Sequence, residues 1–299
     1  MSKIMVDVAH LNVQFGDFFA VKDVSFKVPQ GEIFGFLGAN GAGKTTTIRV
    51  LCGLLPPSAG TVHIDGLEMR AGQENKIKTK VGYMSQHFTL YDALSIAENF
   101  EFAAALRHLN KKTYLDRRRE LLDFIGFREK LSLVVRDLPG GIKQEIALCV
   151  ALLHDPQVIF LDEPTAGVAP VARFRFWQLI KQLAAQGKTV FVTTHYMDEA
   201  ENCHRIALMR AGELIALDSP ENLKRTTFHK TLYNLSPKHA DTPLPDKKLF
   251  DMCEPYGQHY HVILKEESAL KSLRQAFDIE AIKPSLEDVF IRRVEGQNR

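Results

Sequence analysis

Cysteine, charge excess and long apolar runs are all scarce in this chain. Its four cysteines, Cys52, Cys149, Cys203 and Cys253, form no C-x-x-C pair, so we expect neither a disulfide framework nor a cysteine metal site. No apolar run reaches the roughly 18 residues of a membrane helix, so a partner would have to supply any span. Basic and acidic residues number 38 and 36. With these nearly equal numbers, the chain lacks the large excess of positive charge that is typical of nucleic-acid-binding proteins.

The bulk composition is that of an ordinary globular protein. The chain has 299 residues, of which 45% are hydrophobic and 25% charged, enough for one large domain or two. The first residues contain no apolar signal region. We therefore expect a cytosolic protein.

Apolar patterning predicts an α/β fold. Short apolar segments at 5–8, 11–15, 24–28 and 33–37 indicate strands, and the segments 61–64 and 81–85 indicate further ones. Residues 95–127 instead have helical periodicity, beginning at a Ser95-x-x-Glu98 capping-box pattern. Helices and buried strands then alternate, as expected for a parallel sheet; these are helices 140–153 and 170–185 and strands 158–161 and 189–193.

The character of the sequence changes after residue 223. A polar, proline-bearing segment at 236–248 predicts a loop, followed by a strand at 259–264 and a helix at 267–277. Ser285 is a good N-cap for a last helix. We predict a main domain at 1–227 and a small α+β accessory domain at 228–299.

A phosphate-binding loop follows the strand at 33–37. Residues 38–45 fit G-x-x-x-x-G-K-[ST], and a helix-compatible stretch leaves the loop. Backbone N–H groups of such a loop, together with the helix N-terminus, face an anion. Lys44 would reach the β- and γ-phosphates of a nucleotide, and Thr45 would ligate Mg²⁺.

Two adjacent carboxylates end the strand at 158–161. Asp162 suits Mg²⁺, which prefers oxygen ligands. Glu163 could polarise a water against the γ-phosphate. Taken alone, the pair could equally form a solvated turn; its combination with the phosphate loop favours a nucleotide site.

Six ordered features make the chain similar to ATP-binding-cassette (ABC) transporter ATPase subunits over about residues 1–225. Around the phosphate loop, they are Phe15, Gln86, the segment 138–144 containing Gly140 and Gly141, the pair Asp162-Glu163, the loop 166–169 and His195. The segment 284–290 resembles the end of ABC-2-type exporter ATPases, and parts of the chain resemble cassettes of tandem multidrug exporters. The resemblance implies a mixed-sheet cassette with a helical subdomain at about 88–145.

The resemblance also implies a role for each site residue. Phe15 stacks on adenine, although Phe15 could instead be a core residue and Phe18 and Phe19 are rivals. Thr45 and Gln86 ligate Mg²⁺ with support from Asp162, Glu163 is the base and His195 contacts the γ-phosphate. Gly140 and Gly141 close onto the nucleotide of a facing subunit. The phosphate-binding set is Gly38, Asn40, Gly41, Ala42, Gly43, Lys44, Thr45 and Thr46.

The implied function is an ATP-hydrolysing subunit that powers an ABC-2-type exporter of drugs or other hydrophobic cargo. ATP and Mg²⁺ are the expected ligands. Expected partners are a membrane permease subunit and a second ATPase subunit, at the cytoplasmic face of the cell membrane. Phe88, Leu90 and Tyr91 either pack in the core or line a groove for a permease helix. Trp177 and Phe174, three apart on a predicted helix, are expected to pack in the core.

Two departures from the family pattern keep alternatives open. Pro139 stands where serine is usual and offers neither hydroxyl nor N–H. Ala169 stands where aspartate is usual, and both positions serve the facing subunit. A regulatory or weakly hydrolysing cassette acting as an ATP-dependent switch is one alternative, and a soluble non-transport ABC protein is another.

Overall fold

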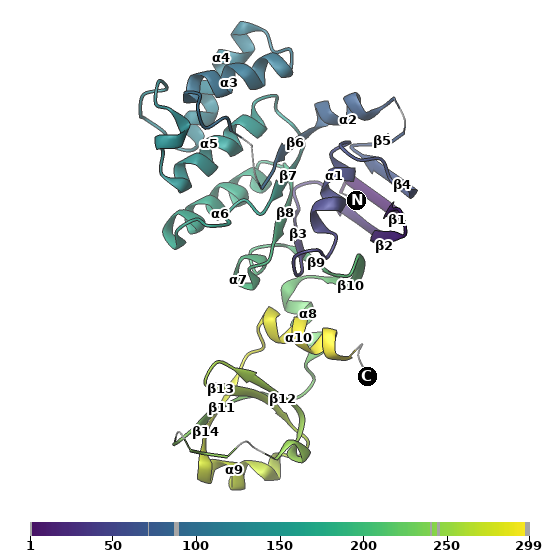
Figure 1. Cartoon of the computed structure of the whole chain (residues 1–299), viewed down its shortest axis with the longest axis vertical. Helices are drawn as coiled ribbons and strands as arrows, with labels where there is room; N and C mark the ends of the chain where they lie inside the picture. The colour runs from purple at the N-terminus through teal and green to yellow at the C-terminus, as the bar shows by residue number, and fades with distance from the viewer. Residues whose placement is uncertain (1, 71, 87–89, 240, 244–245, 297–299) are drawn as a thin grey trace. The chain divides into compact units, whose positions relative to one another are not determined.

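The chain forms two compact units, Met1–Ser219 and Pro220–Arg299. The computed structural model describes residues 2–70, 72–86, 90–239, 241–243 and 246–296. The division falls earlier than the boundary predicted at residue 227, because α8 (Pro220–Thr227) packs against α10 (Leu286–Gly296) within the second unit. Figure 1 labels the elements of both units.

The first unit contains two sheets. The antiparallel sheet has the order β2-β1-β4-β5, formed by Phe18–Pro29, Ile4–Phe15, Ala59–Ile64 and Leu67–Glu68. The second has the order β10-β9-β3-β8-β7-β6 and is parallel except for the edge pair of β10 and β9. Its strands are Glu213–Asp218, Arg205–Arg210, Ile33–Leu37, Thr189–Thr194, Val158–Asp162 and Val81–Met84. The predicted α/β cassette with a mixed sheet is confirmed.

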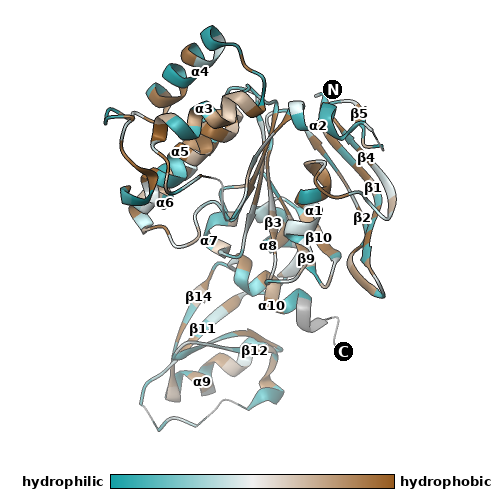
Figure 2. Cartoon of the chain, turned by 45° about the horizontal axis from the view of Figure 1, so that its top comes forward, coloured by the Kyte–Doolittle hydropathy of each residue, from teal (hydrophilic) through white to brown (hydrophobic). Residues whose placement is uncertain are grey.

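The central strands are mostly apolar, as expected for strands that are covered on both faces. Every residue of β3, β7 and β8 is buried, and β3 is largely brown in Figure 2. Five phenylalanines from the two sheets pack together between them, with ring centroids 4.8–6.4 Å apart; they are Phe26, Phe34, Phe36, Phe160 and Phe191. This core holds the antiparallel sheet against the parallel one.

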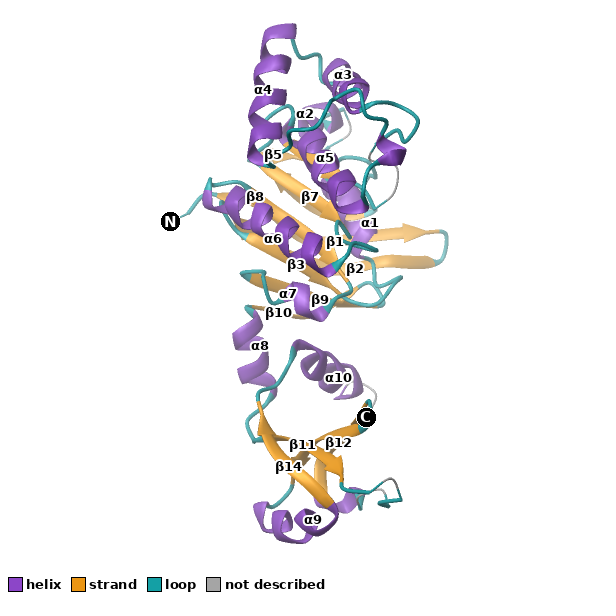
Figure 3. Ribbon diagram, turned by 90° about the vertical axis from the view of Figure 1, so that its left-hand side faces the viewer, coloured by secondary structure: helices purple, strands orange, loops and turns teal. Residues whose placement is uncertain are grey.

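Helices cover the sheet and form a separate cluster beside it. Helices α3 and α4 lie beyond one edge of the sheet together with the start of α5 (Figure 1), and α6 runs across the face of β3 and β8 (Figure 3). The capping box predicted at Ser95 is present, with Ser95 and Glu98 bonding reciprocally. The helices are α1 (Lys44–Leu51), α2 (Glu74–Lys80), α3 (Ile96–Leu106), α4 (Lys111–Phe124), η1 (Val135–Asp137), α5 (Gly140–Leu152), α6 (Pro170–Ala185) and α7 (Met197–Ala200).

One packing prediction on α6 is half wrong. Trp177 is buried, with 3% of its surface exposed, but Phe174 is 68% exposed. Residues three apart on a helix share a face only in part, and the sheet covers the Trp177 side. The elements α2, α7, α8, β5, β9, β10, β11 and β12 have no counterpart among the predicted ones.

The second unit is a four-stranded antiparallel sheet with helices. Its order is β12-β13-β11-β14, formed by Phe250–Tyr256, His259–Leu264, Leu232–Pro237 and Phe277–Ile282. The predicted helix 267–277 is a short 3₁₀ turn, η3 (Glu267–Ala269), followed by α9 (Leu270–Ala276), which packs on a small apolar core of the sheet. A further 3₁₀ turn, η2 (Lys247–Leu249), precedes β12.

The last helix begins at the predicted cap. Ser285 and Asp288 bond reciprocally at the start of α10. The buried Asp288 carboxylate also lies 2.6 Å from His261 Nδ1 on β13. The cap therefore fixes α10 to the sheet as well as starting the helix. None of the helices in the described residues is both long and apolar enough to cross a membrane.

Candidate functional site

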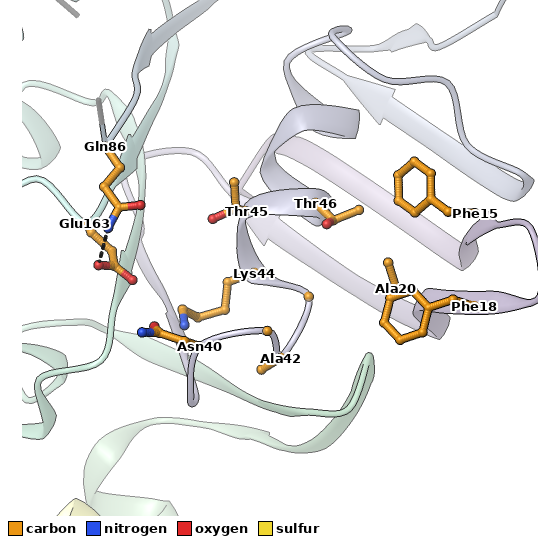
Figure 4. A pocket seen from close by; sticks show the side chains of 12 residues that line it. Phe15, Phe18, Ala20, Asn40, Ala42, Lys44, Thr45, Thr46, Gln86 and Glu163 are labelled. Carbon is orange, nitrogen blue, oxygen red and sulfur yellow. Dashed lines mark hydrogen bonds between the residues drawn. The ribbon is translucent and has the colours of Figure 1, made fainter. Parts of the chain in front are cut away.

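A pocket of about 390 Å³ lies over the phosphate loop. Residues 40–46 form its floor, Phe15, Phe18 and Ala20 one side, and Gln86 and Glu163 the other. Figure 4 shows the two phenylalanines on one side of α1 and the Gln86–Glu163 pair on the opposite side. Parallel strands bring the second group there, because β6, β7 and β8 end at the same edge of the sheet.

The phosphate loop needs its glycines for reasons visible in the backbone. Gly43, which caps α1, has φ +103°, a conformation that favours glycine. A Cβ on Gly43 would also lie 2.6 Å from the Ala20 carbonyl oxygen, and one on Gly38 would lie 2.3 Å from that of Met209. The loop is thus wrapped tightly between β2 and β9, with the start of α1 at the pocket.

Lys44 is held inside the loop. Its Nζ donates to the carbonyl oxygens of Gly38 at 2.7 Å and Ala39 at 3.1 Å. Only 4% of the residue is exposed, and this burial lowers the pKa of Lys44, opposed by the negative charges of Glu163 and Asp162. A poorly hydrated cation bordering an open pocket is a strong site for an anion.

An all-oxygen group lies behind Thr45. Thr45 Oγ1 donates to Asp162 Oδ1 at 3.2 Å, and Thr193 Oγ1 donates to the same oxygen at 2.6 Å. Asp162 is 1% exposed, so these two hydroxyls fix its carboxylate. Hydroxyl and carboxylate oxygens are what a hard divalent cation prefers. The residues present therefore fit Mg²⁺.

Glu163 is held by both its backbone and its side chain. Its backbone has φ +48°, which is rare for a residue with a side chain and is often found at functional sites. Its N–H donates to Thr193 Oγ1 at 2.9 Å. Gln86 Nε2 donates to Glu163 Oε2 at 2.9 Å (Figure 4), and His195 Nδ1 lies 3.3 Å from that oxygen.

Most predicted site residues come together here. Gly38 and Asp162 lie just behind the residues that line the pocket. His195 does not line the pocket itself but contacts Glu163, which does. Phe15 is 52% exposed and lines the pocket, which disfavours its alternative role in the core. Gly140 and Gly141 begin α5 and do not line the pocket. Their expected role toward a facing subunit stays a prediction.

Two further residues line the pocket: Phe18, which the sequence offers only as a rival of Phe15, and Ala20, which is not predicted. Phe18 pairs directly with Phe15 across the turn at Gly16 and Asp17. A two-residue turn always pairs the residues that flank it. The Phe-Gly-Asp-Phe sequence was the signal for the second aromatic.

The structure describes only part of the groove predicted for a permease helix. Phe88 lies outside the described residues, and Leu90 is half-buried. Tyr91 is 52% exposed and its ring lies edge-on to Phe102 at 4.8 Å, and Leu106 is 64% exposed on the same helix as Phe102. These three side chains form an exposed apolar surface on the helical cluster.

The fold and the site together define a cassette ATPase, and the comparisons agree. Residues 21–166 match the ABC transporter family, and the chain belongs to this family. Its sequence is 41% identical over 220 residues to YbhF, a probable multidrug ABC transporter ATP-binding protein of Escherichia coli (strain K12), covering 74% of this chain and 38% of YbhF. The chain therefore spans well under half the length of that relative.

Another relative matches almost end to end. The chain is 32% identical over 303 residues to the Nod factor export ATP-binding protein I of Rhizobium sp. (strain N33), covering 98% of this chain and 97% of the relative. Among solved structures, the ATP-binding cassette MJ0796 in a dimeric post-hydrolysis state with ADP and Pi is similar, with a TM-score of 0.65 and 27% identity over 72% of this chain and 98% of that one.

Proposed function

We propose that this chain binds and hydrolyses ATP to power an ABC-2-type exporter through a separate membrane subunit. The observation that carries the proposal is the gathering of Gln86, Glu163 and His195 on one side of the pocket that holds Lys44. A buried lysine alone supports anion binding. A carboxylate held by two partners next to that lysine supports chemistry as well.

Each residue has a role that its position permits. The loop N–H groups and Lys44 would hold the phosphates and offset charge that develops on phosphoryl transfer. Glu163 Oε2 would accept a proton from the attacking water. His195, 3.3 Å away, would orient Glu163 and approach the γ-phosphate. Phe15, with Phe18 beside it, would stack on the base.

A magnesium ion would be held by Thr45 and Gln86, with Asp162 behind them. When bound, Mg²⁺ neutralises charge on the phosphate oxygens. Thr45 and Asp162 are already within hydrogen-bonding distance of each other. The chain itself therefore pre-positions the oxygen ligands.

The proposed partners are a second ATPase subunit and a permease. The dimeric cassette MJ0796 supports the first, with Gly140 and Gly141 directed at the nucleotide of the facing subunit. The apolar surface of Tyr91, Phe102 and Leu106 supports the second, since an amphipathic helix of a permease would cover it. The chain would then lie peripherally at the cytoplasmic face of the membrane.

The names of the relatives indicate a class of cargo. YbhF is named a probable multidrug ABC transporter ATP-binding protein, and the Rhizobium protein a Nod factor export ATP-binding protein. Drugs or other hydrophobic molecules are therefore the proposed cargo class. The path of the cargo would lie in the permease.

The proposal is tested by Glu163→Gln, which removes the base but keeps the shape. We expect ATP hydrolysis to fall by a factor of about 10² to 10⁴, with ATP binding unchanged. Glu120→Gln, on the exposed face of α4, is the matched control and should hydrolyse ATP like the wild type. Hydrolysis by Glu163→Gln at the wild-type rate would remove Glu163 from the proposed role.

A second candidate is a regulatory cassette that binds ATP and turns it over slowly. Pro139 and Ala169 favour it, because each caps a helix without a side-chain hydrogen bond where a polar residue is usual. Turnover of the full transporter distinguishes the two candidates. A wild-type rate no higher than the background rate of Lys44→Ala, which lacks the phosphate-site lysine, would favour the regulatory cassette.

A further inference from the structure

A buried carboxylate lies behind the site and does not line the pocket. Glu199 belongs to α7, beside β8 and β3, and is only 2% exposed. A buried charge is costly unless it is paired and hydrogen-bonded. The partners of Glu199 therefore indicate what it does.

The two oxygens of Glu199 join two different loops. Thr165 Oγ1 donates to Oε1 at 2.5 Å, and Thr194 Oγ1 donates to Oε2 at 2.7 Å. Both threonines are 1% exposed. Thr165 is two residues after Glu163, and Thr194 immediately precedes His195. One carboxylate thus connects the loops that carry Glu163 and His195.

An arginine completes the arrangement from α6. Arg173 Nε lies 3.3 Å from Glu199 Oε1, close enough for an ion pair, though not aligned as a hydrogen bond. Its guanidinium lies over the Tyr196 ring at 4.3 Å, and that ring lies 4.1 Å from the His195 imidazole. The Tyr196 N–H donates to Thr194 Oγ1 at 3.0 Å. Glu199 and Arg173 therefore hold the loop that carries His195 from both sides.

We propose that Glu199 is a positioning residue for ATP hydrolysis, acting through Thr165 and Thr194 to hold Glu163 and His195 at their 3.3 Å separation. Glu199 is held by bonds to both loops, so a shift of one loop is passed to the other. Small displacements of reacting groups have large effects on rate. The inference rests on the proposed ATPase function but adds a residue outside the pocket to it.

The test removes the two hydroxyls and keeps the shapes. We expect Thr165→Val with Thr194→Val to lower kcat by about 10- to 100-fold, with the equilibrium Kd for ATP within about twofold of the wild type. Thr189→Val is the matched control, since Thr189 is also buried on β8 but at its opposite end, bonded to Pro29. The control should keep the wild-type kcat.

A double-mutant cycle with Glu199→Gln distinguishes a positioning role of the hydroxyls from a contribution to stability alone. If the hydroxyls act through Glu199, Thr165→Val should cost much less in the Glu199→Gln background than in the wild type. Circular dichroism at the assay temperature confirms that each variant is folded. A merely structural contact would lower the melting temperature and leave kcat of the folded enzyme unchanged.

The outcomes are distinguishable from failure of the proposed function. If the wild type turns ATP over and the double valine variant matches it, the positioning role is overturned and the ATPase function stands. If the wild type shows no turnover, NMR of the His195 imidazole, assigned with His195→Ala, decides the matter. We expect its resonances to shift in the double valine variant, and unchanged resonances would overturn the inference.

Discussion

The two halves of the proposed ATP site differ in how they are built. The half that would serve this subunit's own nucleotide is a connected network: Lys44 bonds within its loop, Thr45 bonds Asp162, and Gln86 and His195 meet on Glu163. The half that would be offered to a facing subunit, around Pro139 and Ala169, begins its helices without side-chain caps. Chemistry requires several groups in fixed geometry, whereas a surface completed by a partner can vary with that partner.

The largest expected effect lies in the connected half. His195→Ala should lower kcat for ATP by a factor of about 10² to 10³ while leaving the Kd for ATP within about threefold, because the imidazole orients Glu163 rather than the phosphate loop. Steady-state turnover with equilibrium ATP binding measures both values. His63→Ala, on the outer sheet, is the control. Equal losses in the two variants would contradict the assignment.

The next effect compares two adjacent glycines of α5. A Cβ on Gly141 would lie 2.6 Å from Ala172 Cβ, whereas one on Gly140 would meet nothing within 4 Å. Gly141→Ala should therefore lower the free energy of unfolding by about 1–3 kcal/mol, and Gly140→Ala should not. Denaturant unfolding measures the difference. If the stable Gly140→Ala variant nevertheless lowers ATP turnover of the assembled transporter, Gly140 contacts the facing subunit.

Ala169→Asp tests whether the half of the site that would be offered to a facing subunit limits ATP turnover. With the membrane partner present, we expect turnover to rise by about three- to tenfold, since aspartate would restore a polar contact at the interface. Aspartate would also cap α6 and raise stability by about 1 kcal/mol. Rate and stability are therefore measured separately. An unchanged rate in a more stable protein would mean that Ala169 does not restrict hydrolysis.

The smallest effect is a pH dependence between α5 and α6. Burial raises the pKa of Glu145, opposed by Arg175, whose Nε lies 2.8 Å from Glu145 Oε1. Because the folded-state pKa is above the unfolded one, the folded state gains stability as the pH falls through the folded-state pKa. The wild type should therefore gain stability relative to Glu145→Gln between neutral pH and about pH 4.5. Denaturant unfolding at several pH values measures this, and a constant difference would contradict it.

The sequence predicts the residues of the connected half better than it predicts the residues around them. A loop of fixed spacing, and polar residues at the ends of buried strands, identify Lys44, Gln86, Asp162, Glu163 and His195, because parallel strands end at one edge of the sheet. The sequence offers Phe18 only as a rival of Phe15, and that both line the pocket depends on the hairpin register. Glu199 was missed because its partners are far apart in sequence, and only the fold brings Thr165 and Thr194 to one carboxylate.

The fold is predicted where periodicity is strong. Helix 170–185 and strands 33–37 and 259–264 match α6, β3 and β13. The half-buried strands β10 and β12 have mixed patterns that give no clear period, and α7 is too short to have one. The boundary near residue 220 depends on the contact of α8 with α10, which no local pattern contains.

Equilibrium binding of ATP to the wild type and to Lys44→Ala tests the central claim most directly. The buried Lys44 ammonium is the only lysine charge lining the pocket in the described part of the chain, so its removal should weaken ATP binding by at least about tenfold. Lys22→Ala, on β2 where the lysine pairs with Glu213 and does not line the pocket, should bind as the wild type does. Identical affinities for the wild type and Lys44→Ala would contradict the account.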